Sequence, residues 1–254
     1  MKKFKNILIV LVIGIIVVAG VAIFNKDNKK EIEEEKEKLI MVTEAGFAPY
    51  EFYEGEEIVG VDIEIAKKIA EKVGKELEIK DTDFDSIINE VKTGKADFAA
   101  AGLSITEERL EEVDFSVEYA VSKQVIVVKN ESTAESIEDF NGKKVAVQLG
   151  TIADLVLSDE NPEIELVQHK KYLLAVEDLK ADKVEAIVLD SLPAQEIINK
   201  NPELKILEKE LLIDKYGIAV QKGNAELLKD INEVLQELID NKKIEEYTVK
   251  YLGE

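Results

Sequence analysis

The sequence contains no cysteine, no tryptophan, a single histidine and a single arginine. Without cysteine the chain cannot form a disulfide bond, a thiol nucleophile or a cysteine-ligated zinc site. A serine-histidine-aspartate triad would have to use His169, but no Gly-x-Ser-x-Gly motif is present, so we predict that His169 is a surface or loop residue. Glycine motifs for dinucleotides and phosphates are also missing. We therefore expect a protein without a metal site, a cofactor or catalytic residues.

Positive charge is scarce as well, because 54 acidic residues face 33 basic ones and the formal net charge is -21. This balance excludes nucleic acid as a partner, since the phosphate backbone would be repelled. The apolar fraction of 46% over 254 residues is enough for one large core or two ordinary ones. The composition predicts an acidic globular protein.

The first long apolar run lies at the N-terminus, where three lysines precede an uncharged stretch from Ile7 to Phe24. We interpret residues 1–25 as a signal peptide or a membrane anchor. Gly20-Val21-Ala22 resembles a cleavage site, and both alternatives stay open, with a slight preference for an uncleaved anchor. The lysines favour a cytoplasmic N-terminus, which places the rest of the chain outside the cytoplasm. Residues 26–38 are rich in lysine and glutamate and are predicted to form a charged tether.

From Leu39 onward, short apolar runs bounded by turn residues alternate with amphipathic helical stretches, a pattern typical of an α/β fold. We predict that Asp62 caps an amphipathic helix that ends at about Val73, before Gly74. Its buried side is expected to consist of Ile63, Ile65, Ala66, Ile69 and Ala70. A last strand is expected over 216–221, followed by amphipathic helices over 224–240 and 242–251.

Arg109 lies in the segment Gly102 to Arg109, which follows a predicted buried strand over 97–101. Ligands of open α/β sheets bind beyond the carboxyl ends of strands. A guanidinium group can hold a carboxylate with two parallel hydrogen bonds, and lysine cannot reproduce this geometry. We therefore predict that Arg109 binds an anion. The alternative is an ordinary surface pair with Glu112.

Two further groups are predicted at strand ends in the second half of the chain. The Gly150-Thr151 turn precedes a helix whose N-terminus attracts anions, and Asp190 would attract a cation. Each residue alone is explained equally well as a helix cap. Together with Arg109 they indicate a zwitterionic ligand.

Several segments resemble those of the extracytoplasmic solute-binding proteins of polar amino-acid ABC transporters, which share a type II periplasmic-binding fold with ionotropic glutamate receptor ligand domains. The resemblance covers roughly Leu39 to Leu252. The segments that carry it are Ala45 to Phe52, Val59 to Ile63, Gly102 to Arg109, Val113 to Ser116, Gly142 to Val147, Gly150-Thr151 and Tyr216 to Ala219.

The resemblance implies two α/β lobes joined by a hinge of two chain crossings, with an amino acid bound between them. Lobe 1 would comprise 39–120 and 214–254, and lobe 2 would comprise 121–213. Closure of the lobes around the ligand would be recognised by a membrane permease with its ATPase subunits. A membrane anchor and tether would replace the lipid-bearing cysteine of many bacterial relatives.

The resemblance also assigns roles to individual residues. Arg109 would bind the α-carboxylate with help from Ser104 and Thr151, and Asp190 would bind the α-ammonium with help from the carbonyl of Gly102. The expected walls and side-chain end of the pocket are Phe47, Phe84, Glu44 and Gln148. Glu44 favours a cationic or amide-bearing amino acid, whereas Ile152 lacks a side-chain hydrogen bond that some relatives have at this position.

Two other functions stay open at this point. The first is an enzyme of the same fold that resembles cyclohexadienyl dehydratases, in which Glu44 would protonate a leaving hydroxyl group. The second is a receptor domain that senses amino acids without transport. Binding is preferred over catalysis because the pocket would hold a complete set of groups for a zwitterion.

Overall fold

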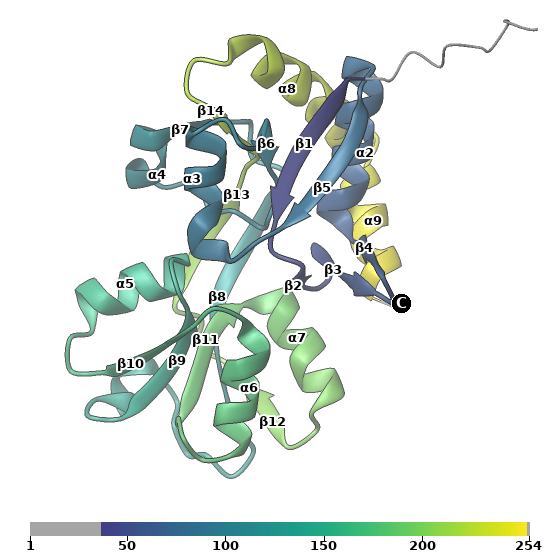
Figure 1. Cartoon of the computed structure of the whole chain (residues 1–254). Helices are drawn as coiled ribbons and strands as arrows, with labels where there is room; N and C mark the ends of the chain where they lie inside the picture. Colours follow the sequence, from purple (N-terminus) through teal and green to yellow (C-terminus); the bar gives the residue numbers. More distant parts are fainter. Residues whose placement is uncertain (1–36, 253–254) are drawn as a thin grey trace, which may run out of the picture. The chain divides into compact units, whose positions relative to one another are not determined.

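The computed structural model describes residues 37–252. The predicted signal or anchor segment and nearly all of the predicted tether lie outside the described residues. Within 37–252, no helix is both long enough and apolar enough to cross a membrane. The described chain forms two α/β lobes, each built on its own sheet (Figure 1).

The sheet of lobe 1 has the strand order β5-β1-β6-β14-β7. Its first three strands are parallel and β14 runs antiparallel to both of its neighbours. The strands are β1 (Lys38–Thr43), β5 (Glu76–Asp81), β6 (Phe98–Ala99), β7 (Val113–Phe115) and β14 (Ala219–Gln221). The helices are α2 (Val61–Val73), η1 (Phe84–Ser86), α3 (Ile87–Lys92), α4 (Glu107–Glu112), α8 (Ala225–Asp240) and α9 (Lys243–Leu252).

The sheet of lobe 2 has the order β10-β9-β11-β8-β12, and β13 also pairs with β8. The central strand β11 is buried along its whole length, in agreement with its apolar sequence from Ala186 to Leu189 before Asp190. The strands are β8 (Ala120–Lys129), β9 (Lys144–Gln148), β10 (Glu165–His169), β11 (Ala186–Asp190), β12 (Leu204–Ile206) and β13 (Leu212–Tyr216). The helices are η2 (Ile137–Phe140), α5 (Ile152–Glu160), α6 (Tyr172–Lys180) and α7 (Ser191–Lys200).

A small antiparallel sheet, β2 (Gly46–Phe47), β3 (Glu51–Glu54) and β4 (Glu57–Val59), follows β1. The peptide bond between Ala48 and Pro49 is cis. This sheet turns the chain away from the end of β1 and back towards the start of α2. It thereby places the 44–51 segment beside the carboxyl ends of the lobe 1 strands.

The chain passes between the lobes along β8 and β13, which pair antiparallel from Leu212 with Gln124 to Tyr216 with Ala120. Figure 1 shows these two strands running side by side from one lobe towards the other. Tyr216 also forms an isolated bridge with Ser104, which connects the second crossing to the loop after β6. The exact residues at which the lobes begin and end remain predictions.

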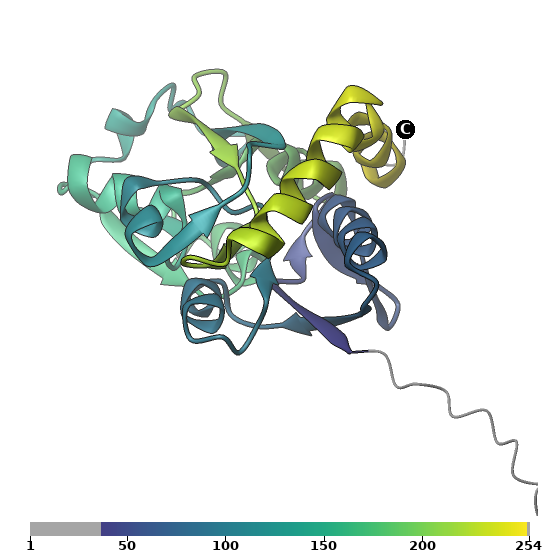
Figure 2. The same ribbon diagram turned by 90° about the horizontal axis from the view of Figure 1, so that it is seen from above.

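The C-terminal helices return to lobe 1 and pack against α2 (Figure 2). The predicted apolar face of α2 is confirmed, because its residues Ile63, Ile65, Ala66, Ile69 and Ala70 are all buried. At the rim of this packing, Lys72 of α2 pairs with Glu233 of α8 at 2.6 Å, and Glu64 pairs with Lys250 of α9 at 2.9 Å. Helices α8 and α9 thus complete the core of lobe 1, to which β1 also belongs.

Three local predictions are wrong. Gly60, and not Asp62, occupies the N-cap of α2, because the Asp62 side chain is buried and accepts hydrogen bonds from distant groups. The predicted strand over 216–221 is divided between β13 and β14, which belong to different sheets. His169 is the last residue of β10, and its side chain is only 15% exposed because Asp178 lies 3.2 Å from its Nε2.

Gly60 provides a test of how this packing depends on backbone geometry. Its φ of +134° is unfavourable for any residue with a Cβ, and a Cβ there would lie 2.0 Å from the carbonyl oxygen of Tyr50. We predict that Gly60→Ala lowers the free energy of unfolding by about 2–4 kcal/mol. Gly55→Ala is the matched control, because Gly55 also has a positive φ but has no atom within 4 Å of a built Cβ. Its loss should be about 1 kcal/mol. Equal losses in urea denaturation would contradict the steric argument.

Candidate functional site

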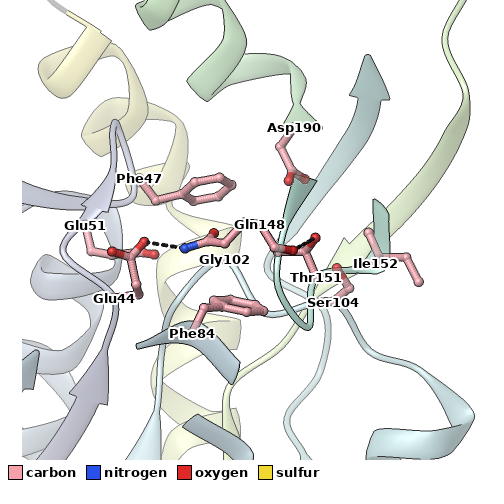
Figure 3. Close-up of a pocket in the computed structure, with 10 residues that line it drawn as sticks. All are labelled: Glu44, Phe47, Glu51, Phe84, Gly102, Ser104, Gln148, Thr151, Ile152 and Asp190. Atoms are coloured by element: carbon pink, nitrogen blue, oxygen red, sulfur yellow. Dashed lines mark hydrogen bonds between the residues drawn. The ribbon is translucent and has the colours of Figure 1, made fainter. Parts of the chain in front are cut away.

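A small cavity lies between the two lobes. It is lined by Glu44, Phe47, Glu51, Phe84, Gly102, Ser104, Gln148, Thr151, Ile152 and Asp190 (Figure 3). All predicted site residues except Arg109 therefore meet around one cavity. The glutamates lie at one end, and Asp190, Ser104 and Thr151 lie towards the other.

Arg109 is 7% exposed and lies beside the cavity. Its Nη1 donates to the carbonyl of Ser104 at 2.7 Å and its Nη2 donates to the carbonyl of Gly150 in the other lobe at 2.9 Å. The surface pair with Glu112 is not formed, since Glu112 pairs with Lys92. A guanidinium group has five N–H donors, so others stay available for a carboxylate bound near Ser104 and Thr151.

The charge of Arg109 persists despite its position. Burial lowers its pKa to about 10, which still leaves the group protonated at neutral pH. The guanidinium carbon lies 5.5 Å from the centre of the Phe84 ring, an arrangement that favours a cation over an aromatic face. Arg109 is thus a fixed positive charge at the boundary of the two lobes.

Two threonines cap the helices that begin at this end of the cavity. The hydroxyl of Thr106 accepts the backbone N–H of Arg109 at 3.2 Å, which holds the first turn of α4. Thr151 caps α5 by accepting from the backbone N–H of Asp154. The capping role expected for Thr151 is therefore present, and the same residue also lines the cavity.

Gly102 must be a glycine for two reasons. Its φ is +51°, and a Cβ there would lie 2.7 Å from the ring of Phe47. Its backbone N–H donates to the carboxylate of Asp62 at 2.9 Å, which fixes the loop that follows β6. The carbonyl of Gly102 is thus held close to the cavity by a residue forty positions earlier in the chain.

Asp190 stands at the carboxyl end of β11 and occupies the N-cap position of α7 without a side-chain capping bond. Its carboxylate instead accepts a hydrogen bond from the hydroxyl of Tyr216. Burial, and then the negative charge of Asp214, raises the pKa of Asp190. A ligand ammonium group would reverse this shift, because it would stabilise the ionised carboxylate.

Asp214 is a site residue that the sequence did not reveal. It lies on β13, accepts a hydrogen bond from the hydroxyl of Ser104, and has a pKa that is raised mainly by burial. From the surrounding sequence, Leu212–Tyr216, one would predict that Asp214 is an exposed acid on an edge strand. Its contact with Ser104 places it next to a residue that lines the cavity.

The aromatic rings of Phe47 and Phe84 form opposite walls of the cavity in Figure 3. Phe47 is 6% exposed and stacks on Tyr50 and Tyr172 at centroid distances of 5.9 and 5.8 Å. The guanidinium group of Arg109 lies over one face of the Phe84 ring. The amide of Gln148 lies between the two rings in Figure 3 and points towards Glu44.

Glu44 is 2% exposed, and both of its oxygens are engaged by the other lobe. Oε1 pairs with the ammonium group of Lys171, and Oε2 accepts from Nε2 of Gln148 at 3.2 Å. Burial raises the pKa of Glu44, while Lys171 opposes that rise. Lys171 was not expected from the sequence, because it lies on a polar turn before α6.

Glu51 is a second cavity residue without a predicted role, although it belongs to the Ala45 to Phe52 segment that carried the resemblance. It is fully buried, and neither of its carboxyl oxygens has a hydrogen-bond partner among the described residues. Between Tyr50 and Phe52, a glutamate looks like a solvent-exposed strand residue. Only the alternation of β3 reveals that its side chain points inward.

The lobes touch through several polar contacts around the cavity. Arg109 contacts Gly150, and Glu44 contacts Lys171 and Gln148. In addition, Lys170 pairs with Asp83, and Lys171 lies 3.5 Å from Asp81. All of these join a residue of one lobe to a residue of the other. The structure therefore shows the lobes closed around the cavity.

A cavity between two lobes with these sheet orders defines a two-lobed binding protein of the type II periplasmic-binding fold. Residues 39–254 match the family of bacterial extracellular solute-binding proteins, family 3, and the chain belongs to this family.

Three similar proteins illustrate the relationship. The arginine-binding extracellular protein ArtP of Bacillus subtilis is 33% identical over 86% of this chain and 88% of its own length. A mutant of ArgBP from T. maritima is 40% identical, with a TM-score of 0.82 over 85% of this chain and 96% of that one. AbpA of Streptococcus pneumoniae bound to L-arginine is 32% identical, with a TM-score of 0.82 over 85% of this chain and 94% of that one.

The position of Arg109 predicts the effect of a conservative change. Arg109→Lys keeps the charge, but a single ammonium group cannot contact Ser104, Gly150 and a ligand carboxylate with the same geometry. We expect amino-acid binding to weaken at least about tenfold, or about 1.4 kcal/mol, in titration calorimetry. Glu112→Gln is the control and should leave the affinity unchanged. An unchanged affinity in Arg109→Lys would exclude Arg109 as the carboxylate anchor.

The raised pKa of Asp190 predicts a pH dependence of binding. A bound α-ammonium requires the ionised carboxylate, so the contribution of Asp190 is present above its raised pKa and is lost as the pH falls through it. We expect the affinity to decline by up to about tenfold per pH unit below that pKa, and to begin declining above the ordinary value of 3.8. Calorimetry between neutral pH and about pH 5 measures this. Asp190→Asn should bind the amino acid weakly over this whole pH range. If Asp190 binds the α-ammonium, the affinity of this variant must depend less on pH than that of the unmodified protein.

Proposed function

We propose that this protein binds a free amino acid with a cationic side chain between its lobes, outside the cytoplasm, and delivers it to the permease of an ABC transporter. The observation that carries the proposal is the division of the cavity into two chemically different ends. One end combines a guanidinium group with a carboxylate, the other holds two carboxyl groups, and aromatic walls connect them. An amino acid such as arginine has the complementary order of charges.

The zwitterion end is formed by Arg109, Ser104, Thr151, Gly102 and Asp190. Arg109 and Ser104 lie in lobe 1, whereas Thr151 and Asp190 lie in lobe 2. A ligand that binds to both sets of groups favours the closed arrangement of the lobes. Binding energy from the zwitterion is in this way converted into a change that a permease can recognise.

The side-chain end is formed by Glu44, Glu51 and Gln148, beyond the rings of Phe47 and Phe84. Aliphatic carbons of a long side chain fit between the rings, and its terminal cation would lie against the glutamates. The names of the relatives support the same class of ligand, because ArtP and ArgBP are named for arginine and AbpA was solved with L-arginine bound. We therefore favour arginine among the cationic amino acids.

An amide-bearing amino acid is the second candidate ligand, and one observation favours it. Lys171 already pairs with Glu44, so part of the negative charge at the side-chain end is compensated before any ligand binds. The two candidates differ in the ligand charge that they require.

A catalytic role on the same fold is the alternative that we rank below binding. Burial raises the pKa of Glu44, a property that an acid catalyst needs. The relatives named above are binding proteins, however, and the groups around the cavity account for a complete amino acid. We propose that the protein is not an enzyme and that its N-terminal segment tethers it to the membrane.

A ligand panel tests the proposal. The melting temperature of the purified full chain would be measured with arginine, lysine, histidine, glutamine, glutamate, leucine and prephenate. Arginine should give the largest increase, because a ligand at 100 times its Kd stabilises the folded protein by about 2.7 kcal/mol. Stabilisation only by acidic or apolar amino acids would refute the proposal, and turnover of prephenate or arogenate would favour the enzyme.

A further inference from the structure

Glu51 is the carboxyl group of the cavity that receives no hydrogen bond from the described residues of the protein. It is fully buried at the start of β3, lines the cavity beside Glu44, and has no hydrogen-bond donor on either oxygen among the described residues (Figure 3). A buried acid without donors is costly when it is ionised. Its position towards the cavity indicates that a ligand supplies the missing partner.

Glu44 cannot take this role as readily. Lys171 pairs with one of its oxygens and Gln148 donates to the other. A ligand cation at Glu44 would compete with an ion pair that the protein already forms. The uncompensated carboxyl group at the side-chain end is therefore Glu51.

The groups that face Glu51 favour its protonated form. Burial raises the pKa of Glu51 well above its ordinary value, and neighbouring negative charges raise it further. The titratable groups around it come from five segments and are Asp62 of α2, Glu44 after β1, Asp190 of β11, Tyr50 before β3 and Tyr119 before β8. The nearest cation, Lys171, acts on Glu44.

Asp62 and Glu51 differ in their contacts. Asp62 accepts from the backbone N–H of Gly102 at 2.9 Å and from the hydroxyl of Tyr119 at 2.8 Å, both of which stabilise its ionised form. Glu51 has no such donor, and after burial the negative charge of Asp62 is the largest cause of its raised pKa. Of the two acids, Glu51 is therefore the one that holds a proton more readily.

We propose that Glu51 receives the cationic end of the ligand side chain and loses its proton to solvent as that cation binds. The inference rests on the proposed function, since it assumes an amino acid in the cavity. The charges balance, because a neutral acid and a cation become an ion pair and one proton leaves. Glu51 would thereby make the affinity for a cationic side chain depend on pH, whereas a neutral side chain would leave the proton in place.

Arginine and citrulline separate this effect from the other end of the cavity. The two ligands have the same zwitterion and nearly the same shape, but the side chain of citrulline is neutral. Titration calorimetry of the full chain near neutral pH, in phosphate and in Tris, gives the number of protons released from the dependence of the heat on the buffer. We expect close to one proton more for arginine than for citrulline. Equal proton release with both ligands would overturn the proposal, because any release at Asp190 is common to both.

Variants locate the proton. Glu51→Gln should abolish the difference in proton release and weaken arginine binding at least about tenfold, with little effect on citrulline. Glu54→Gln is the matched control, because Glu54 is an exposed glutamate on the same strand and should behave like the unmodified protein. Arginine binding with unchanged affinity and proton release in Glu51→Gln would refute the role of Glu51. If Glu51→Gln does not fold, the comparison of arginine with citrulline in the unmodified protein still decides.

Failure of this inference and failure of the proposed function give different results. If no amino acid raises the melting temperature or produces heat, the proposed function is wrong and the inference falls with it. If arginine binds but releases no more protons than citrulline does, the function stands. Glu51 then acts only as a neutral acceptor or as a structural acid.

Discussion

The concentration of buried carboxyl groups between the lobes is the constraint on which the rest of the site depends. Glu44, Glu51, Asp62 and Asp190 are each 5% exposed or less. Ionised carboxylates in such a place are unstable unless donors or cations reach them. Asp62 obtains its donors from Gly102 and Tyr119, and Asp190 obtains one from Tyr216. These bonds tie α2 to the loop after β6 and to Tyr119, and they tie β11 to the hinge strand β13.

Two cations of the protein meet this acidic region, and each connects the lobes. Arg109 reaches from lobe 1 to the carbonyl of Gly150, and Lys171 reaches from lobe 2 to Glu44. Opening the lobes would separate Lys171 from the buried carboxylate of Glu44. The closed arrangement is therefore partly stabilised by electrostatic attraction. The ligand and these two side chains act on the same equilibrium between open and closed lobes.

The sequence predicts the groups whose positions follow from local structure. Arg109, Thr151 and Asp190 follow buried strands, and the carboxyl ends of strands in an α/β sheet converge on one edge, so their meeting could be expected. The resemblance added the rings and Glu44, whose position at the cavity the structure shows and whose roles remain predictions. The apolar face of α2 was predicted correctly because helical periodicity alone determines it.

The remaining residues could not be predicted because their positions are set by pairs of segments far apart in the chain. Asp62 has the residue type and location of a helix cap, yet its partners Gly102 and Tyr119 lie forty and fifty-seven positions away. Tyr216, the last residue of β13, was assigned to the strand over 216–221 because the sequence has no charged residue from Tyr216 to Val220, whereas the chain changes sheets at Gly217. Lys171 and Asp214 are charged residues at positions that look exposed in the sequence. Lys171 meets Glu44 across the two lobes, and Asp214 meets Ser104, which lies 110 positions earlier in the chain.

The balance of charge in the closed site argues for the class of ligand more strongly than any one contact does. A zwitterion contributes one positive and one negative group, which Asp190 and Arg109 match, and it leaves the charge at the other end unchanged. Lys171 compensates Glu44, and Asp62 is stabilised by neutral donors. Glu51 then remains as the buried acid without a donor, and by our proposal it becomes an anion when a positive charge arrives. A cationic side chain is the ligand group that completes this arrangement, and a neutral one leaves Glu51 as it was.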